Sequence, residues 1–300
     1  MTPARALSGS AFATLLLIAL MMAGNHVAAR VAFNHGADVA TAVIFRSVVT
    51  ALVLVALLAA QGVRVRFSAR HKRMLPLIGL LIGVQSLCLY SSVARLPVAL
   101  ALLAFNTYPI WAALWSWAFY KQPPARPLLL AMPVILVGLA LALDVFGAAS
   151  GLGAQGQWVR IGAGVGFALA AGATFGLAMV MTQHEAGDVD GRVRTATTMT
   201  MAGLVALTLV VAQGGFQLPQ APVGWGGLVA LTFLYGTAFT IMFTVLPRLG
   251  VVGNSAIMNV EPVFALVLAW LILDQAIAPM QVLGALIVVG AVMMLGLRKR

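Results

Sequence analysis

Two ionisable side chains lie inside long apolar runs of this chain, where charged residues are rare. Glu261 follows the run GVVGNSAIMNV, and Arg46 lies within the run ATAVIFRSVVTALVLVALL. A buried carboxylate is costly, so Glu261 is a candidate for binding a proton or a substrate ammonium group, the alternative being a structural hydrogen bond to a neighbouring helix. A guanidinium group stays charged and needs an acid, carbonyl groups or water around it. Arg46 is therefore either a ligand for a substrate carboxylate or a buried charge that clamps helices together.

Two prolines interrupt apolar runs at matching places in the two halves of the chain. Pro109 and Pro262 each remove a backbone donor and free a carbonyl group one turn earlier. In lipid such a break is tolerated where neighbouring helices, side chains or water satisfy the freed group. Segments interrupted at corresponding places in two halves point to a transport site. We expect both prolines to act as hinges beside a central cavity, a plain packing kink being the alternative.

The composition requires that the elements holding these residues cross a membrane. Apolar residues make up 62% of the 300 residues and charged residues only 8%, whereas a soluble domain has about 25% charged residues. This excludes a cytosolic enzyme, a secreted disulfide scaffold and a soluble nucleic-acid-binding protein. With one cysteine, Cys88, no internal disulfide can form. We expect the lipid bilayer as a partner, and neither nucleic acid, a cofactor nor a metal ion.

The apolar runs predict ten membrane-spanning helices, since a bilayer core needs about 20 apolar residues per helix. The first run is long enough to span and is followed by others, so we interpret it as a helix rather than a cleaved signal peptide. The predicted spans are residues 9–30, 38–60, 74–94, 97–120, 127–145, 159–182, 193–213, 224–246, 250–273 and 277–297.

The basic residues predict the orientation of these spans. Lys and Arg are enriched in cytoplasmic loops, and the chain ends on three basic residues, Arg298, Lys299 and Arg300. Placing this end in the cytoplasm puts 14 of the 18 basic residues on that side, with Arg46 inside a span. The net charge of +11 is then a marker of topology. We expect a multi-pass protein of a bacterial-type inner membrane with both termini in the cytoplasm.

The second half of the chain repeats the first with an offset of about 153 residues. Residues 95–122, RLPVALALLAFNTYPIWAALWSWAFYKQ, align with residues 248–275, RLGVVGNSAIMNVEPVFALVLAWLILDQ, with eight identities. Each repeat, 8–146 and 159–297, contains five spans. Because five is odd, the second repeat is inverted in the membrane relative to the first. Inverted repeats are typical of secondary transporters that alternate access around a site at the repeat interface.

Glu261-Pro262-Val263-Phe264-Ala265 and Phe45-Arg46, set in ten spans and two repeats, resemble the drug/metabolite transporter superfamily, EamA type. The resemblance implies a ten-helix exporter with a cavity lined by spans 1, 3, 4, 6, 8 and 9, and YddG-like amino-acid exporters are one branch. Span 2 is peripheral in that plan, so we favour the clamp for Arg46. Tyr108 in place of Glu before Pro109 departs from the usual pattern.

Polar and aromatic residues in the implied cavity spans are few. An apolar wall with a few directed polar groups suits a moderately hydrophobic metabolite. His26 can titrate near neutral pH, but a lone histidine in a membrane is more often a packing residue. The candidate substrate-binding residues are Asn25, His26, Gln85, Tyr90, Asn106, Tyr108, Phe175, Tyr235, Asn259 and Glu261.

These features predict a transporter rather than an enzyme. The chain has no Walker lysine loop, so we expect a secondary exporter of small amphipathic metabolites, chiefly aromatic or hydrophobic amino acids, that works as a monomer. The alternatives are an exporter of drugs, nucleosides or sugar conjugates and a flippase for lipid intermediates.

Overall fold

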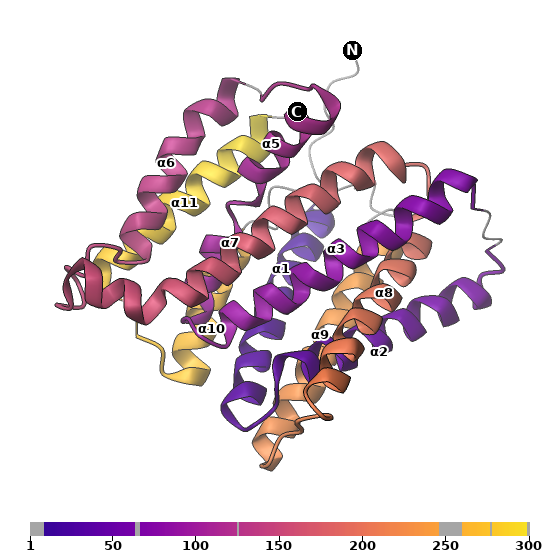
Figure 1. Ribbon diagram of the computed structural model, residues 1–300, viewed down its shortest axis with the longest axis horizontal. Helices are drawn as coiled ribbons and strands as arrows, with labels where there is room; N and C mark the ends of the chain where they lie inside the picture. Colours follow the sequence, from indigo (N-terminus) through magenta and orange to yellow (C-terminus); the bar gives the residue numbers. More distant parts are fainter. Residues whose placement is uncertain (1–8, 64–66, 125, 246–259, 277, 299–300) are drawn as a thin grey trace.

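The structure is a computed structural model that describes residues 9–63, 67–124, 126–245, 260–276 and 278–298. Within these ranges the chain forms helices and turns and no strand (Figure 1). The helices are α1 (Gly9–Asn34), α2 (Val39–Ala60), α3 (Ala69–Val93), α4 (Val98–Phe105), α5 (Tyr108–Tyr120), α6 (Arg126–Ala142), α7 (Gly153–Glu185), α8 (Gly191–Ala212), α9 (Pro222–Thr244), α10 (Glu261–Leu273) and α11 (Pro279–Arg298).

The helices agree with the ten predicted spans. Seven segments are long and apolar enough to cross a membrane, with α4 and α5 counted together as Val98–Tyr120. Three shorter apolar helices, α6, α10 and α11, complete the set within the described residues. Only the second half of the ninth span is described. The predicted all-α membrane fold with two inverted five-helix repeats is confirmed.

The fourth span departs from the prediction because it is two helices rather than one. α4 ends at Phe105, and Asn106 and Thr107 form a turn before α5 begins at Tyr108. Pro109 and Pro262 both lie in the first turn of a helix, where the missing N–H would have no helical partner in any case. Pro109 therefore begins a helix instead of bending one, Pro262 lies in the first turn of α10, and the role of both as hinges stays a prediction.

The two repeats match in local geometry. α5 and α10 have 13 residues each and begin 153 positions apart. Each ends on a residue in the left-handed region, Lys121 with φ 56° and Asp274 with φ 52°. The next residue, Gln122 or Gln275, then donates its backbone N–H to a carbonyl of the last turns. Both repeats thus form the same helix end.

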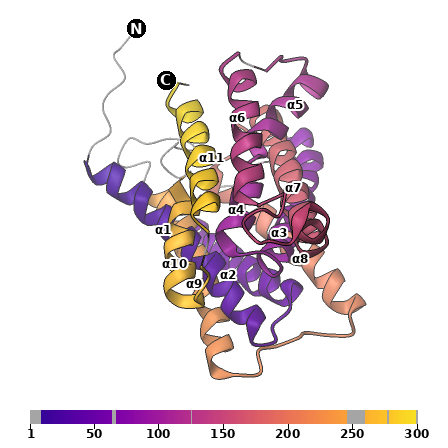
Figure 2. The same ribbon diagram turned by 90° about the vertical axis from the view of Figure 1, so that its left-hand side faces the viewer.

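The repeats interlock by reciprocal packing. α1 packs on α9 and α3 packs on α7, so the first helix of each repeat lies against the third helix of the other. The second helices, α2 and α8, pair with each other, as do the fifth helices, α6 and α11 (Figures 1 and 2). α1 begins and α11 ends toward one end of the bundle, here called the terminal end (Figure 1). The opposite end, with the α6–α7 and α10–α11 connections, is called the distal end.

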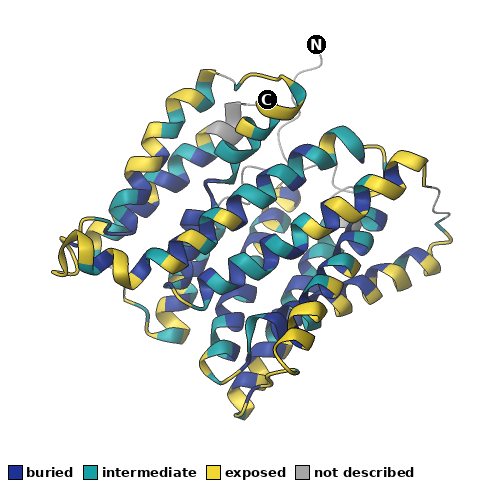
Figure 3. Ribbon diagram, in the orientation of Figure 1, coloured by how far each residue is buried: buried dark blue, intermediate teal, exposed yellow. Residues whose placement is uncertain are grey.

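Burial follows the helix faces that point into the bundle (Figure 3). α4 is the most enclosed element, because every residue from Val98 to Ala104 is buried. It contacts α7 and α10 as well as α3, α6 and α11, so both repeats surround it. By contrast, no residue of α5 is fully buried. The break after Phe105 thus separates an enclosed half-span from a looser one.

Glycines allow the closest contact between α1 and α9. A Cβ at Gly227 would lie 2.7 Å from Ala28 O and 2.8 Å from Ala32 N, whereas a Cβ at Gly226 would meet nothing within 4 Å. We expect Gly227→Ala to force the helices apart, at a cost of about 1–3 kcal/mol. Gly226→Ala should be neutral or stabilising, since alanine is the better helix former by about 1 kcal/mol. Melting temperatures in detergent test this, and equal values for the two variants would contradict the packing.

Candidate substrate-binding site

A buried polar cluster lies where α1, α2, α3, α9 and α10 meet. At its centre is Tyr90 of α3, which is 0% exposed. Its hydroxyl donates to Asn25 Oδ1 of α1 at 2.7 Å. The Arg46 guanidinium of α2 lies over the Tyr90 ring at 4.7 Å and over the Tyr235 ring at 4.1 Å. One cation is thereby held by aromatic groups of both repeats.

The charge of Arg46 is stabilised without a carboxylate partner among the described residues. Its Nη2 donates to Ser86 Oγ at 2.7 Å. The faces of two aromatic rings also attract a cation, by about 2 kcal/mol or more where water is excluded. Arg46 Nε is buried and has no hydrogen-bond partner in the described part of the chain. The guanidinium is thus positioned but retains a free donor for an anionic group.

Glu261 pairs with His26 across the repeat interface. His26 Nε2 lies 3.3 Å from Glu261 Oε1. The His26 side chain is 4% exposed and the Glu261 side chain 22% exposed, so the carboxylate retains access to solvent. As the first residue of α10, Glu261 lies at the positive end of a helix dipole, which favours a negative charge. The His26 ring also meets Tyr90 edge-on, with centroids 5.6 Å apart, and so links the two charged groups.

Three aromatic rings gather at the break between α4 and α5. Phe105 lies 5.7 Å from Tyr108 and 5.4 Å from Phe175 of α7, measured between ring centroids. Tyr108 and Phe175 lie 5.1 Å apart in an edge-on arrangement. This aromatic group packs where Gly172 and Gly176 let α7 approach the break closely. It offers apolar ring faces and one phenol.

Comparison with known proteins gives the family. A model of the EamA-like transporter family matches residues 9–143 and again residues 162–297. The chain belongs to the EamA-like transporter family. The double match confirms that the domain is duplicated, and it makes the protein a membrane transporter.

One protein sequence and one solved structure are similar to this EamA-like transporter. An uncharacterized transporter of Synechocystis sp. is 24% identical over 230 residues, which are 74% of this chain and 65% of the relative. The match therefore spans less than two thirds of that relative's length. A crystal structure of a protein superposes with a TM-score of 0.62 at 18% identity, over 95% of this chain and 98% of that one. This likeness supports the fold.

The EamA-like transporter brings most of the predicted site residues into these two groups. The polar cluster contains Asn25, His26, Tyr90, Tyr235 and Glu261, and Gln85 is linked to it because Ser86 Oγ donates to Gln85 Oε1 at 3.4 Å. The aromatic group contains Tyr108 and Phe175. Asn106 is buried as the C-cap of α4, and Asn259 lies outside the described residues.

Sequence reasoning missed two features of the cluster. Arg46 was placed at the periphery with span 2, whereas it is 3% exposed and reaches rings of α3 and α9. Ser47 and Thr50, beside Arg46 on α2, are buried hydroxyls with no partner among the described residues. Asn25 Nδ2 and His26 Nδ1 share this property. Buried polar groups are normally satisfied, so this unused capacity fits a place that binds water or a polar solute.

The described residues contain no group of three or more His, Cys, Asp or Glu side chains placed to hold a metal ion. The cluster instead combines one cation, one carboxylate with a histidine, and aromatic faces. Such a set can bind charged and apolar parts of one small molecule.

Proposed function

We propose that this EamA-like transporter is a secondary exporter of small amphipathic metabolites, chiefly amino acids with aromatic or other apolar side chains. The proposal rests on the presence of one cation, Arg46, and one carboxylate, Glu261, in the same cluster, which also contains the rings of Tyr90 and Tyr235. A zwitterion presents a carboxylate and an ammonium group, and the cluster offers a cation and an anion. The aromatic rings match an apolar side chain.

The position of the cluster supports a mechanism of alternating access. α1, α2 and α3 belong to the first repeat, and α9 and α10 belong to the second. Rocking one repeat against the other would open the cluster to each side in turn. The break before Tyr108 is where the fourth span of the first repeat can change its angle. A substrate that binds Glu261 would compete with His26 for the carboxylate. Substrate binding would therefore be coupled to breaking of the His26–Glu261 pair.

A counterflow screen in proteoliposomes tests the proposal. Vesicles preloaded with an unlabelled solute take up the same labelled solute only if the protein carries it. We expect counterflow with labelled tryptophan, phenylalanine or methionine, and none with labelled uridine or glucose. Counterflow with uridine alone would favour the nucleoside alternative, and no counterflow with any of these solutes would contradict the proposal.

We also propose that the terminal end faces the cytoplasm of a bacterial-type inner membrane. The exposed basic residues Arg70, Lys72 and Arg73 lie there, at the start of α3, and cytoplasmic loops are enriched in such residues. A green fluorescent protein fused after Arg300 should fluoresce, and alkaline phosphatase fused there should be inactive. Active phosphatase would show that the terminal end faces the opposite side of the membrane.

We propose that the protein works as a monomer. It should elute from a size-exclusion column as a single chain in its detergent micelle.

A further inference from the structure

A polar pocket lies at the distal end of the bundle. Its volume is about 460 Å³, which is within the range of about 300–1,000 Å³ for small-molecule sites. The α3–α4, α6–α7 and α10–α11 connections line it, together with Arg30 of α1 and residues in the N-terminal parts of α4, α7 and α11. Both repeats therefore contribute. The pocket adjoins the start of α4, and the aromatic group adjoins the end of α4. The two ends of this helix are about 12 Å apart, because it has eight residues.

The pocket has a strongly positive lining. Arg30, Arg95 and Arg160 all border it, with one acidic residue, Asp144. Ala149 N–H and Ser150 N–H donate to the two oxygens of Asp144 at 3.0 and 2.8 Å. Although burial alone raises the pKa of Asp144, these hydrogen bonds outweigh it and lower the pKa below its usual value. Asp144 is thus occupied by its own loop and forms no ion pair with the three arginines in the described structure.

Two of the three arginines, Arg30 and Arg95, are held in place by hydrogen bonds to backbone oxygens yet keep donors for a ligand. Arg30 Nη1 donates to Val93 O at 2.6 Å, while its Nε is buried without a partner among the described residues. Arg95 Nη1 donates to Ser91 O at 2.9 Å, and its guanidinium lies 4.8 Å from the Phe167 ring centre. Arg160 is exposed at the rim. Guanidinium groups bind carboxylate and phosphate through paired hydrogen bonds.

The backbone at the N-terminus of α4 adds to the positive electrostatic potential of the pocket. Leu96, Pro97 and Leu100 line the pocket, so the N-terminus of α4 borders it. Pro97 provides no side-chain cap, and Gln275 Oε1 accepts from Val98 N–H at 3.0 Å. A helix N-terminus favours a nearby anion. The glutamine also ties the α10–α11 connection to α4, which makes the pocket a shared feature of both repeats.

We propose that the distal pocket binds an anionic group, a carboxylate or a phosphate, through Arg30, Arg95 and Arg160. The site is separate from the polar cluster around Tyr90. The anionic group can belong to a free solute or to a phospholipid headgroup, since both present the same oxygens to the arginines.

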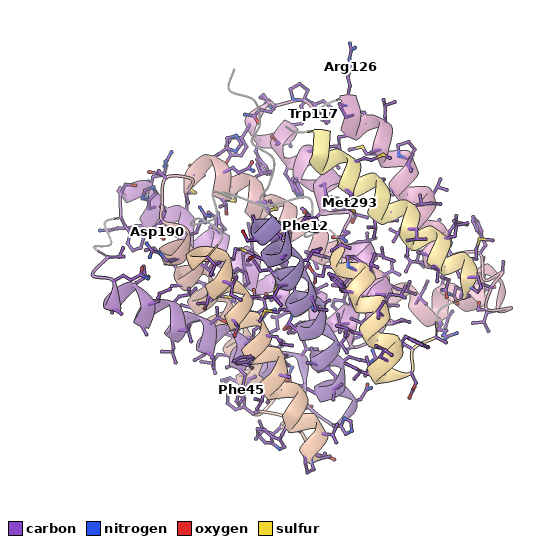
Figure 4. The ribbon with its side chains drawn as sticks, turned by 180° about the vertical axis from the view of Figure 1, so that it is seen from behind. Phe12, Phe45, Trp117, Arg126, Asp190 and Met293 are labelled. Carbon is purple, nitrogen blue, oxygen red and sulfur yellow. The ribbon has the colours of Figure 1, made fainter. Side chains whose placement is uncertain are left out.

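The first arm of the test measures free anions on the purified protein in detergent. Inorganic phosphate and citrate should each raise the melting temperature saturably. The double variant Arg95→Gln/Arg160→Gln, which changes exposed side chains only, should bind at least about tenfold more weakly, because charge-assisted hydrogen bonds are lost. Arg126→Gln is the matched control, since Arg126 projects from the other end of the bundle (Figure 4) and should leave binding unchanged.

The second arm tests a lipid source by native mass spectrometry with added phosphatidylglycerol or phosphatidylcholine. Retention of phosphatidylglycerol by the wild type, lost in the double variant, supports the pocket as a headgroup site. Saturable phosphate or citrate binding in the first arm supports it as a site for free anions. The proposal is overturned if the wild type binds none of these anions, or if the double variant binds them as the wild type does.

Discussion

Glu261→Gln should abolish solute counterflow while leaving the fold intact. Glutamine has the shape of glutamate and can still hydrogen-bond to His26, which lies 3.3 Å from the carboxylate. It cannot carry the negative charge that would bind an ammonium group or exchange a proton. Loss of one partner of a buried charge pair costs about 2–5 kcal/mol, so we expect flux to fall by about 30-fold or more.

The control for this variant is Glu185→Gln. Glu185 is the other glutamate of the chain, at the end of α7, where its carboxylate accepts from the Tyr120 hydroxyl. The Glu185→Gln variant should transport the solute like the wild type. If Glu261→Gln also transported like the wild type at every pH, the carboxylate would have only a structural role and the proposed function of Glu261 would be wrong.

Arg46→Met should remove transport beyond any loss of stability. Methionine fills much of the space between the Tyr90 and Tyr235 rings but provides no charge and no donor to Ser86. If the guanidinium binds substrate, flux per folded molecule should fall by about tenfold to a hundredfold, as expected when a charge-assisted hydrogen bond is lost. Arg46→Lys should retain part of the flux, because the charge stays but the planar guanidinium does not.

Two measurements on each variant separate a substrate ligand from a clamp. Counterflow gives flux, and the melting temperature in detergent gives stability. Arg73→Met, at an exposed position of α3, is the matched control and should change neither. If Arg46→Met lowers the melting temperature but keeps the flux per folded molecule, Arg46 is a clamp that holds helices together, which is the role that the sequence favours.

The sequence predicted the spans and the repeat because both depend on local composition. Lipid requires a long apolar run for each helix, and matched residues such as Asn106 with Asn259 make the repeat visible. The break after Phe105 was foreseen only as a kink at Pro109, since a proline does not determine on which side of it a helix ends. The structure places Pro109 in the first turn of α5.

The site was harder to predict because it is built by contacts between distant residues. His26 and Glu261 were both named, but no local pattern pairs residues of α1 and α10. Arg46 was recognised as a buried charge, yet which face of α2 points inward is decided by packing against α8 and α9. The distal pocket was missed for the same reason, since its three arginines come from three separate connections and helix ends.

In the proposed function, the cluster of Arg46, His26, Tyr90 and Glu261 holds the transported solute. Equilibrium binding of the labelled solute identified by counterflow, to purified protein in detergent, tests this most directly. We expect one bound molecule per wild-type chain, at least about tenfold weaker binding to Glu261→Gln and Arg46→Met, and unchanged binding to Glu185→Gln and Arg73→Met. Wild-type affinity in both cluster variants would contradict the account.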